Sequence, residues 1–276
     1  MADLVIRTGW RPDQEDWDYL ATPTVRAFSA PRDFVPPEKM SYRGILKVEN
    51  QGNMSSCVGH GGSSGMELLQ FLSNGGQTQM SRMMCYLIAQ RASNIRGDNG
   101  AVISACVQAL AATGLCLESE FPYPPRYNPN LPQSAIQAGS KHKILGHQPL
   151  NSYREVFDWI SQAKGPVLFG MSWYQRVANG NGTITPDSLR GPSYGGHCNV
   201  FCGYNGKKDS NGNYYIDALN SHGTSSGQGG WFEWSPDAVD VLCQQERGQS
   251  SVIGMTDITG FDQERVDRVV DWTTVV

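Results

Sequence analysis

The sequence predicts an α+β fold with two lobes, the first mainly helical and the second built from β-strands. Between residues 57 and 113, apolar side chains recur at helical spacing in three successive segments. Between residues 166 and 234, short apolar runs alternate with turns that contain glycine. A chain of 276 residues is long enough for one large domain or for two lobes with cores of their own.

Composition excludes several classes of protein. Hydrophobic residues make up 39% and charged residues 17% of the chain, which is typical of a globular protein. The net charge of −4 indicates neither a nucleic-acid partner nor an anionic membrane surface. No apolar run approaches the roughly 18 residues that would span a membrane. The first ten residues lack a basic region followed by an apolar core, so we expect no signal peptide.

The cysteine count bears on compartment and cofactors. Seven cysteines leave at least one thiol without an intramolecular disulfide partner, and no C-x-x-C pair is present. We expect a reducing compartment with mostly free thiols, although one or two disulfides remain compatible with the count. No strand-like run leads into the glycines around Gly59, which argues against a dinucleotide-binding loop. We expect no metal and no cofactor.

The chain divides into four segments. Residues 1–44 are rich in proline, aspartate and aromatic residues, and we expect an extended segment that packs on the lobes or near the cleft between them. Residues 45–132 are expected to form the helical lobe and residues 133–245 the β lobe, with a proline-rich connection at 120–132. Residues 246–276 are expected to form a C-terminal tail of one strand and one helix.

Three helices are expected in the first lobe. The first, over 57–73, begins with small residues and ends with apolar ones, which indicates a buried helix that other elements approach closely. The second covers 79–93. The third covers 101–113, with a cap at 98–100 and an end at Gly114.

The second lobe begins with a helix over 151–163, where Ser152 and Glu155 fit a capping box. Strands are expected over 167–171, 197–204, 214–219 and 231–234. The segment 209–213 reads as a hairpin turn, because its glycine is misplaced for a calcium loop. The tail is expected to hold a weak strand over 251–255 and a short helix over 265–270.

Cys57 is the strongest candidate for chemistry. It is expected in the first turn of a helix, where the helix dipole and unpaired N–H groups favour the thiolate, which is the nucleophilic form of cysteine. Gln51 lies six residues upstream, where its side-chain amide can aim at the same reacting atom.

His197 and Asn220 complete a candidate constellation. His197 starts a strand 140 residues after Cys57, and Asn220 ends the next strand 163 residues after Cys57. A thiol hydrolase needs a thiolate, an imidazole that takes and returns a proton, and a group that orients the imidazole. Cys198 lies on the opposite face of the strand from His197, as does Cys202, so a shared metal site is not expected.

These motifs resemble those of the papain family of cysteine peptidases, most closely its compact bacterial and phage members. Gln51-Gly52-x4-Cys57 has the spacing of the family's oxyanion glutamine and nucleophile. Gly196-His197 with Gly203-Tyr204 resembles its histidine strand, and Asn220-Ser221-x-Gly223 resembles its asparagine loop. Further matches are Gly9-Trp10-x-Pro12-Asp13, Asp98-Asn99-Gly100, and segments within 109–119 and 121–123. The likeness extends from about residue 9 to about residue 240.

The resemblance implies a fold and roles. It implies a helical lobe and an antiparallel, β-barrel-like lobe with the active-site cleft between them. Cys57 would attack a peptide carbonyl as a thiolate paired with the His197 imidazolium, Asn220 would orient the ring, and Gln51 would hold the oxyanion. The residues expected to bind substrate are Asn99, Gly100, Gly170, Met171 and Gly196. The expected partner is a peptide or protein substrate, with no nucleic acid and no membrane.

The sequence departs from the family pattern at several positions. Met54 and Asp98 replace the two cysteines of a family disulfide, which fits a reducing compartment. Val58 replaces the aromatic residue after the nucleophile, and Ala101 replaces a cleft glycine. His222 replaces the tryptophan that shields the His–Asn hydrogen bond, so we expect water to come closer to that bond.

Two alternative functions stay open. One is a weakly active or inactive scaffold that binds peptide or serves as a structural component, suggested by His222. The other is a cysteine amidase that acts on cell-wall peptide. We also expect the segment before residue 40 to restrain activity by packing near the cleft. The expected location is the cytoplasm or a phage-infected cell or virion, and the sequence does not indicate an oligomeric state.

Overall fold

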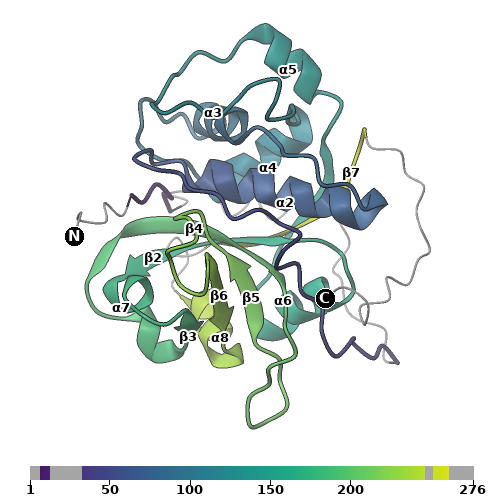
Figure 1. Cartoon of the computed structure of the whole chain (residues 1–276), viewed down its shortest axis with the longest axis vertical. Coiled ribbons are helices and arrows are strands. Elements are labelled where there is room, and N and C mark those ends of the chain that lie inside the picture. The colour runs from purple at the N-terminus through teal and green to yellow at the C-terminus, as the bar shows by residue number, and fades with distance from the viewer. Residues whose placement is uncertain (1–6, 13–32, 246–250, 261–276) are drawn as a thin grey trace.

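The computed structural model describes residues 7–12, 33–245 and 251–260. These residues form a helical half and a β half, and helix α2 (Cys57–Asn74) runs along the boundary between them (Figure 1). One continuous hydrophobic core joins the two halves, because α2 contacts strands as well as helices. The predicted α+β fold with two lobes is confirmed.

Helix α2 is buried over its first four turns, as its composition of small residues predicted. A Cβ at Gly59 would lie 2.7 Å from the Cβ of Tyr86, and a Cβ at Gly61 would lie 2.9 Å from the Sγ of Cys198. Only glycine allows α3 (Arg82–Ala92) to approach one side of α2 and the sheet to approach the other.

Two helices begin later than the sequence predicted. Helix α3 begins at Arg82 because the Ser81 hydroxyl caps it by accepting from the Met84 N–H at 3.1 Å. Helix α4 (Ile103–Ala112) begins after Val102, so residues 98–100 do not cap it. A short helix, α5 (Gln133–Gly139), was not predicted and lies with the helical half (Figure 1).

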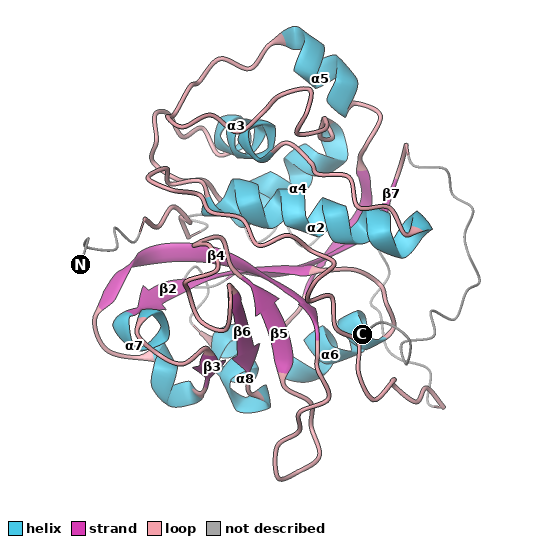
Figure 2. Ribbon diagram, viewed as in Figure 1, coloured by secondary structure: helices cyan, strands magenta, loops and turns pink. Residues whose placement is uncertain are grey.

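In the described part of the chain, seven strands form one sheet in the order β1-β7-β2-β4-β5-β6-β3 (Figure 2). They are β1 (Ile144–Pro149), β2 (Val167–Tyr174), β3 (Thr183–Ile184), β4 (Ser193–Gly203), β5 (Ile216–Leu219), β6 (Trp231–Trp234) and β7 (Ser251–Ile258). All neighbours are antiparallel except β3 and β6. Strand β1 was not predicted, and β7 reaches three residues beyond the predicted 251–255.

Further helices accompany the strands of the β half. They are α6 (Tyr153–Ser161), α7 (Gln175–Ala178), a 3₁₀ helix (Pro186–Leu189) and α8 (Pro236–Gln244). The Ser152 hydroxyl caps α6, and the Glu155 carboxylate accepts from the Asn151 N–H. In the 209–213 turn, Asp209 accepts from the backbone N–H groups of Asn211 and Asn213. The predicted helix at 265–270 lies outside the described residues.

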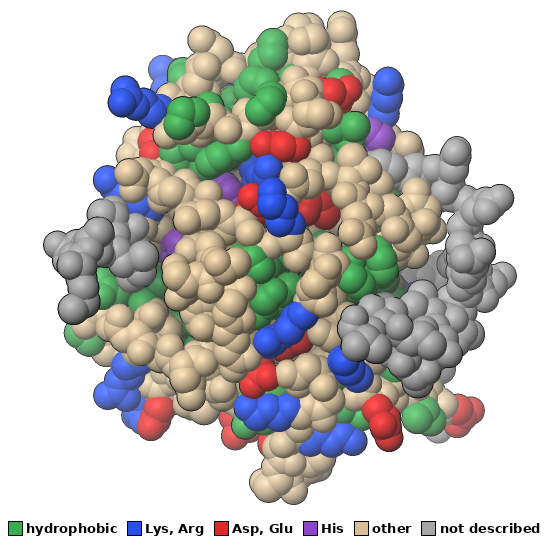
Figure 3. Space-filling view, in the orientation of Figure 1, with side chains coloured by type: hydrophobic (Ala, Val, Ile, Leu, Met, Phe, Trp, Pro, Cys, Tyr) green, Lys and Arg blue, Asp and Glu red, His purple; other side chains and the backbone are tan. Residues whose placement is uncertain are grey.

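No helix of the described part is long and apolar enough to cross a membrane. On the face seen in Figure 3, basic and acidic side chains are interspersed, with no extended patch of one sign.

Candidate active site

Cys57 is the first residue of α2 and is fully buried. The preceding loop is tied to the helical half, because the Ser55 N–H donates to the Asp98 carboxylate at 2.8 Å, and Asp98 also accepts from the Tyr86 hydroxyl at 2.9 Å. The carboxylate therefore links these two segments without a disulfide. All seven cysteines are free thiols.

His197 and Asn220 meet across neighbouring strands. His197 lies in the middle of β4, and Asn220 directly follows β5, which pairs with β4. The His197 Nε2 and the Asn220 Oδ1 are 2.8 Å apart, and the Asn220 amide donates to the Ser226 hydroxyl at 3.1 Å. The His197 Nδ1 is buried and has no hydrogen-bond partner. With Nε2 donating to Asn220, Nδ1 carries the free lone pair that a general base needs.

Gln51 is locked by the residue after Asn220. Its backbone N–H donates to the Ser221 carbonyl at 2.8 Å, and the Ser221 hydroxyl donates to its Oε1 at 2.7 Å. The amide nitrogen Nε2 must therefore face the other way, where it donates to the carbonyls of Met54 at 2.8 Å and Arg7 at 3.2 Å. Sequence reasoning missed the role of Ser221, although Ser221 belongs to the recognised Asn220 motif.

The chain's own residues 7–11 occupy the cleft beside Cys57. The Gly9 carbonyl accepts from the Ala101 N–H at 2.8 Å, and the Arg11 N–H donates to the Ala101 carbonyl at 2.9 Å. The Trp10 N–H donates to the Gly196 carbonyl at 2.9 Å. The segment is thus an extended peptide held between the helical and β halves by its backbone. A Cβ at Gly9 would collide with the Ser55 carbonyl, so this position requires glycine.

Trp10 fills a pocket in the wall of the cleft. Its side chain is only 3% exposed, and its indole lies where a Cβ at Gly170 would be. Gly196 contacts its backbone, and Asn99 accepts from the Arg11 side chain through its carbonyl at 2.8 Å. Gly100 contacts the Gly9 carbonyl.

Four of the five predicted substrate-binding residues therefore contact the segment, namely Asn99, Gly100, Gly170 and Gly196. Met171 pairs with His197 in the strand register and is fully buried. Side chains alternate along a strand, so Met171 points to the opposite face from the Gly170 position against which Trp10 packs.

With the cleft occupied, burial favours the uncharged forms of the Cys57 thiol and the His197 imidazole. Burial raises the pKa of the Cys57 thiol to about 11, although nearby backbone groups lower it in part. Burial, assisted by the neighbouring His222, holds the pKa of His197 well below its usual range. Removing both groups from water penalises both charges in this closed state, so the thiolate–imidazolium pair stays a prediction for the open cleft.

His222 stacks on the catalytic candidate His197. The two rings lie 4.3 Å apart with an interplanar angle of 14°, and Trp173 packs edge-on against both. Asn220 is only 3% exposed and His197 is fully buried. The expectation that His222 admits water to the His–Asn pair is therefore wrong in this state, since Trp173 and His222 cover it together. Trp173 carried no motif signal in the sequence.

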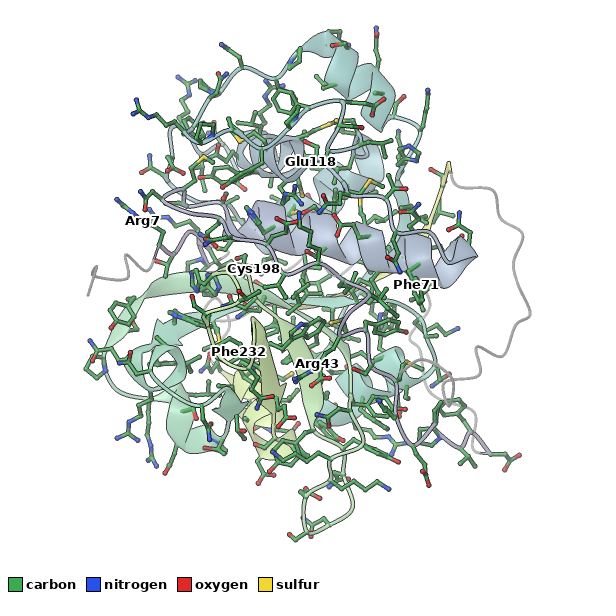
Figure 4. The ribbon with its side chains drawn as sticks, viewed as in Figure 1. Arg7, Arg43, Phe71, Glu118, Cys198 and Phe232 are labelled. Atoms are coloured by element: carbon green, nitrogen blue, oxygen red, sulfur yellow. The ribbon has the colours of Figure 1, made fainter. Side chains whose placement is uncertain are left out.

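No metal site accompanies these residues. Within residues 7–12, 33–245 and 251–260, no three side chains of the types that bind metal ions gather in one place. Cys198 belongs to β4 and packs against Gly61 of α2 (Figure 4).

Solved structures share this fold. Xylellain, a cysteine protease from Xylella fastidiosa, superposes with a TM-score of 0.73 over 91% of this chain and 96% of its own, at 17% identity. Procathepsin B S9 from Trypanosoma congolense gives 0.67 over 91% and 86%, at 16% identity. Bromelain from Ananas comosus, solved with the inhibitor E64, gives 0.61 over 80% and 99%, at 18% identity.

The sequence itself matches a family. A search of curated protein sequences finds no match. The family model described as papain family cysteine protease matches residues 35–253, which is most of the chain and includes the positions of Cys57, His197 and Asn220. The chain therefore belongs to the papain family of cysteine proteases.

Proposed function

We propose that the chain hydrolyses peptide bonds with Cys57 as nucleophile, His197 as general base and acid, and Asn220 as the residue that orients the imidazole. One observation carries this proposal. An extended peptide, the chain's own residues 7–11, lies over a thiol at a helix N-terminus and beside a hydrogen-bonded His–Asn pair. A cleft that holds peptide backbone at such a thiol suits a peptidase.

The proposed reaction has two halves. The His197 Nδ1 takes the proton of Cys57, the sulfur bonds to the substrate carbonyl carbon, and the proton passes to the amine as the C–N bond breaks. Water, deprotonated by His197, then attacks the thioester and releases the acid and the thiol. The Gln51 Nε2 and the Cys57 N–H would hold the oxyanion in both halves. Ser221 fixes the direction of the Gln51 amide that this needs.

We infer that the described state is latent. Residues 7–11 exclude substrate from Cys57, and the burial that they help impose keeps the thiol protonated. A peptide substrate would bind only after the segment leaves, which returns Cys57 and His197 to water and favours their charged forms.

A peptidase assay tests the proposal. The full chain carrying Trp10→Ala, which loosens the segment, is expected to cleave an unfolded protein substrate. Cys57→Ala and His197→Ala in the same background are expected to lose that activity, with retained folding shown by circular dichroism. If the folded Trp10→Ala protein cleaves no protein or peptide, the peptide-binding scaffold is favoured. Activity confined to cell-wall peptides or non-peptide amides would instead establish an amidase.

A further inference from the structure

A small cavity lies between α2 and the strands that carry His197 and Asn220. Its wall includes His60 and Ser64 of α2, Cys198 (labelled in Figure 4) and Asn199 of β4, and Asn220 after β5. The cavity leaves about 10 Å³ for the centre of a water molecule. Roughly 10–15 Å³ on this measure is what a single water needs, so the cavity has the size of one water site.

His60 contributes a buried acceptor to this wall. Its Nδ1 lies 3.1 Å from the Ser56 carbonyl oxygen, and because a carbonyl only accepts, Nδ1 carries the proton and Nε2 the lone pair. The Nε2 atom is buried and has no hydrogen-bond partner among the described residues. Burial lowers the pKa of His60 to about 4, so at neutral pH the ring is uncharged and Nε2 remains an acceptor.

Asn199 contributes a second acceptor to the same wall. The residue is 3% exposed, and its Oδ1 is buried without a hydrogen-bond partner in the part of the chain that the structure describes. A carbonyl oxygen and an imidazole lone pair both accept, so Asn199 Oδ1 and His60 Nε2 cannot satisfy each other. Leaving two buried acceptors unpaired is costly, whereas a water molecule has one O–H for each of them.

We propose that this cavity binds one water molecule, which donates one O–H to the His60 Nε2 and the other to the Asn199 Oδ1. The Ser64 hydroxyl, in the same wall, can donate to the water oxygen. His60 lies about one turn after Cys57 on α2, and Asn199 lies two residues after His197 on the same face of β4. The water thus bridges the helix of the nucleophile to the strand of the general base. His60 and Asn199 are positioning residues, a role that rests on the proposed peptidase function.

A crystal structure of the full chain and a double-mutant cycle test the bridge. The structure should show an ordered water within hydrogen-bond distance of both acceptors. His60→Phe and Asn199→Leu each remove one acceptor and leave the other unpaired, whereas the double variant leaves neither. In denaturant titrations, Asn199→Leu should therefore lower the folding equilibrium constant roughly 5- to 150-fold less in His60→Phe protein than in the wild type.

The matched control combines His60→Phe with Val239→Ala. Val239 is buried in α8, which packs on α6 and the 3₁₀ helix, and the two effects should add. An empty cavity in a crystal structure that shows ordered waters elsewhere would overturn the water site. Additive effects of His60→Phe and Asn199→Leu would overturn the bridge between them.

The positioning role is tested by kinetics in the Trp10→Ala background, with active sites counted by an epoxide inhibitor of papain-type thiols. His60→Phe and Asn199→Leu should each lower kcat per active site several-fold with little change in KM, because Cys57 and His197 are then less well aligned. An unchanged kcat per active site would overturn the positioning role. Failure of the Trp10→Ala parent to cleave any peptide would overturn the peptidase function, and the water bridge would still be decided by the crystal structure and the double-mutant cycle.

Discussion

Replacing Trp10 by alanine should expose the Cys57 thiol. Trp10 is 3% exposed and buries nearly its whole side chain in the cleft, while the thiol beneath the segment is fully buried. Truncating a buried tryptophan to alanine typically costs about 3–5 kcal/mol. Since about 1.4 kcal/mol changes an equilibrium tenfold, the open form should become roughly 10²- to 4 × 10³-fold more populated.

Alkylation by iodoacetamide measures this directly, because only an accessible thiolate reacts. Peptide mapping is needed, since Cys243 is half-buried and is expected to react as background. Val35→Ala is the matched control, as Val35 is 83% exposed and an alanine there removes no buried contact. The reasoning is refuted if folded Trp10→Ala protein is alkylated at Cys57 no faster than the wild-type protein and Val35→Ala.

Three further outcomes follow from the same contacts. In the wild-type chain, the rate of Cys57 alkylation should keep rising with pH towards about pH 11, because burial raises the thiol pKa. In Trp10→Ala the rate should level off at lower pH. Superimposable pH profiles would show that residues 7–11 do not control the pKa of the thiol. Gln51→Ala should lower kcat about 10²- to 10³-fold, because it removes an oxyanion donor. Ser221→Ala should lower kcat several-fold, because loss of the Ser221 hydroxyl frees the Gln51 amide to rotate. Steady-state kinetics in the Trp10→Ala background measure both effects, and an unchanged kcat in both variants would contradict them. Burial raises the pKa of Glu67 to about 7, so its carboxylate destabilises the fold above pH 7 and this cost disappears as the pH falls towards 4.5. Glu67→Gln should therefore raise the free energy of unfolding at pH 8 by up to about 3 kcal/mol, with little gain near pH 4.5; denaturant titration showing a loss at pH 8 would contradict this.

The candidate residues could be predicted from the sequence because their motifs are local. Small residues and a preceding loop predict a helix start at Cys57. The positions of His197 and Asn220 relative to predicted strands are also local features of the sequence. The pairing of β4 with β5 then brings the last two together at 2.8 Å. These are features that spacing and periodicity report well.

Other parts of the site depend on contacts between distant segments, which spacing does not report. Trp173 covers His197 only because β2 pairs with β4. Asp98 lies in a motif that predicted a helix cap, but tertiary contacts with Ser55 and Tyr86 use its carboxylate instead. The path of residues 7–11 also depends on surfaces from both halves, so the sequence indicated packing near the cleft but not which residues enter it.

Some elements and boundaries were not predicted correctly because their local sequence signals are weak. Strand β1 has a burial pattern without regular alternation, and its place is set by β7, about a hundred residues later. The predicted start of the second helix at residue 79 was wrong because Met80 bridges to Leu117 before Ser81 caps the helix. Helix boundaries here depend on caps and long-range bridges rather than on apolar spacing.

The central claim is that Cys57 is a nucleophile activated by His197. Intact mass after treatment with an epoxide inhibitor of papain-type thiols tests this claim most directly, with Trp10→Ala protein as the parent. The account predicts one adduct, absent in Cys57→Ala and formed much more slowly in His197→Ala. A folded parent that forms no adduct, or an adduct that persists in Cys57→Ala, would contradict it.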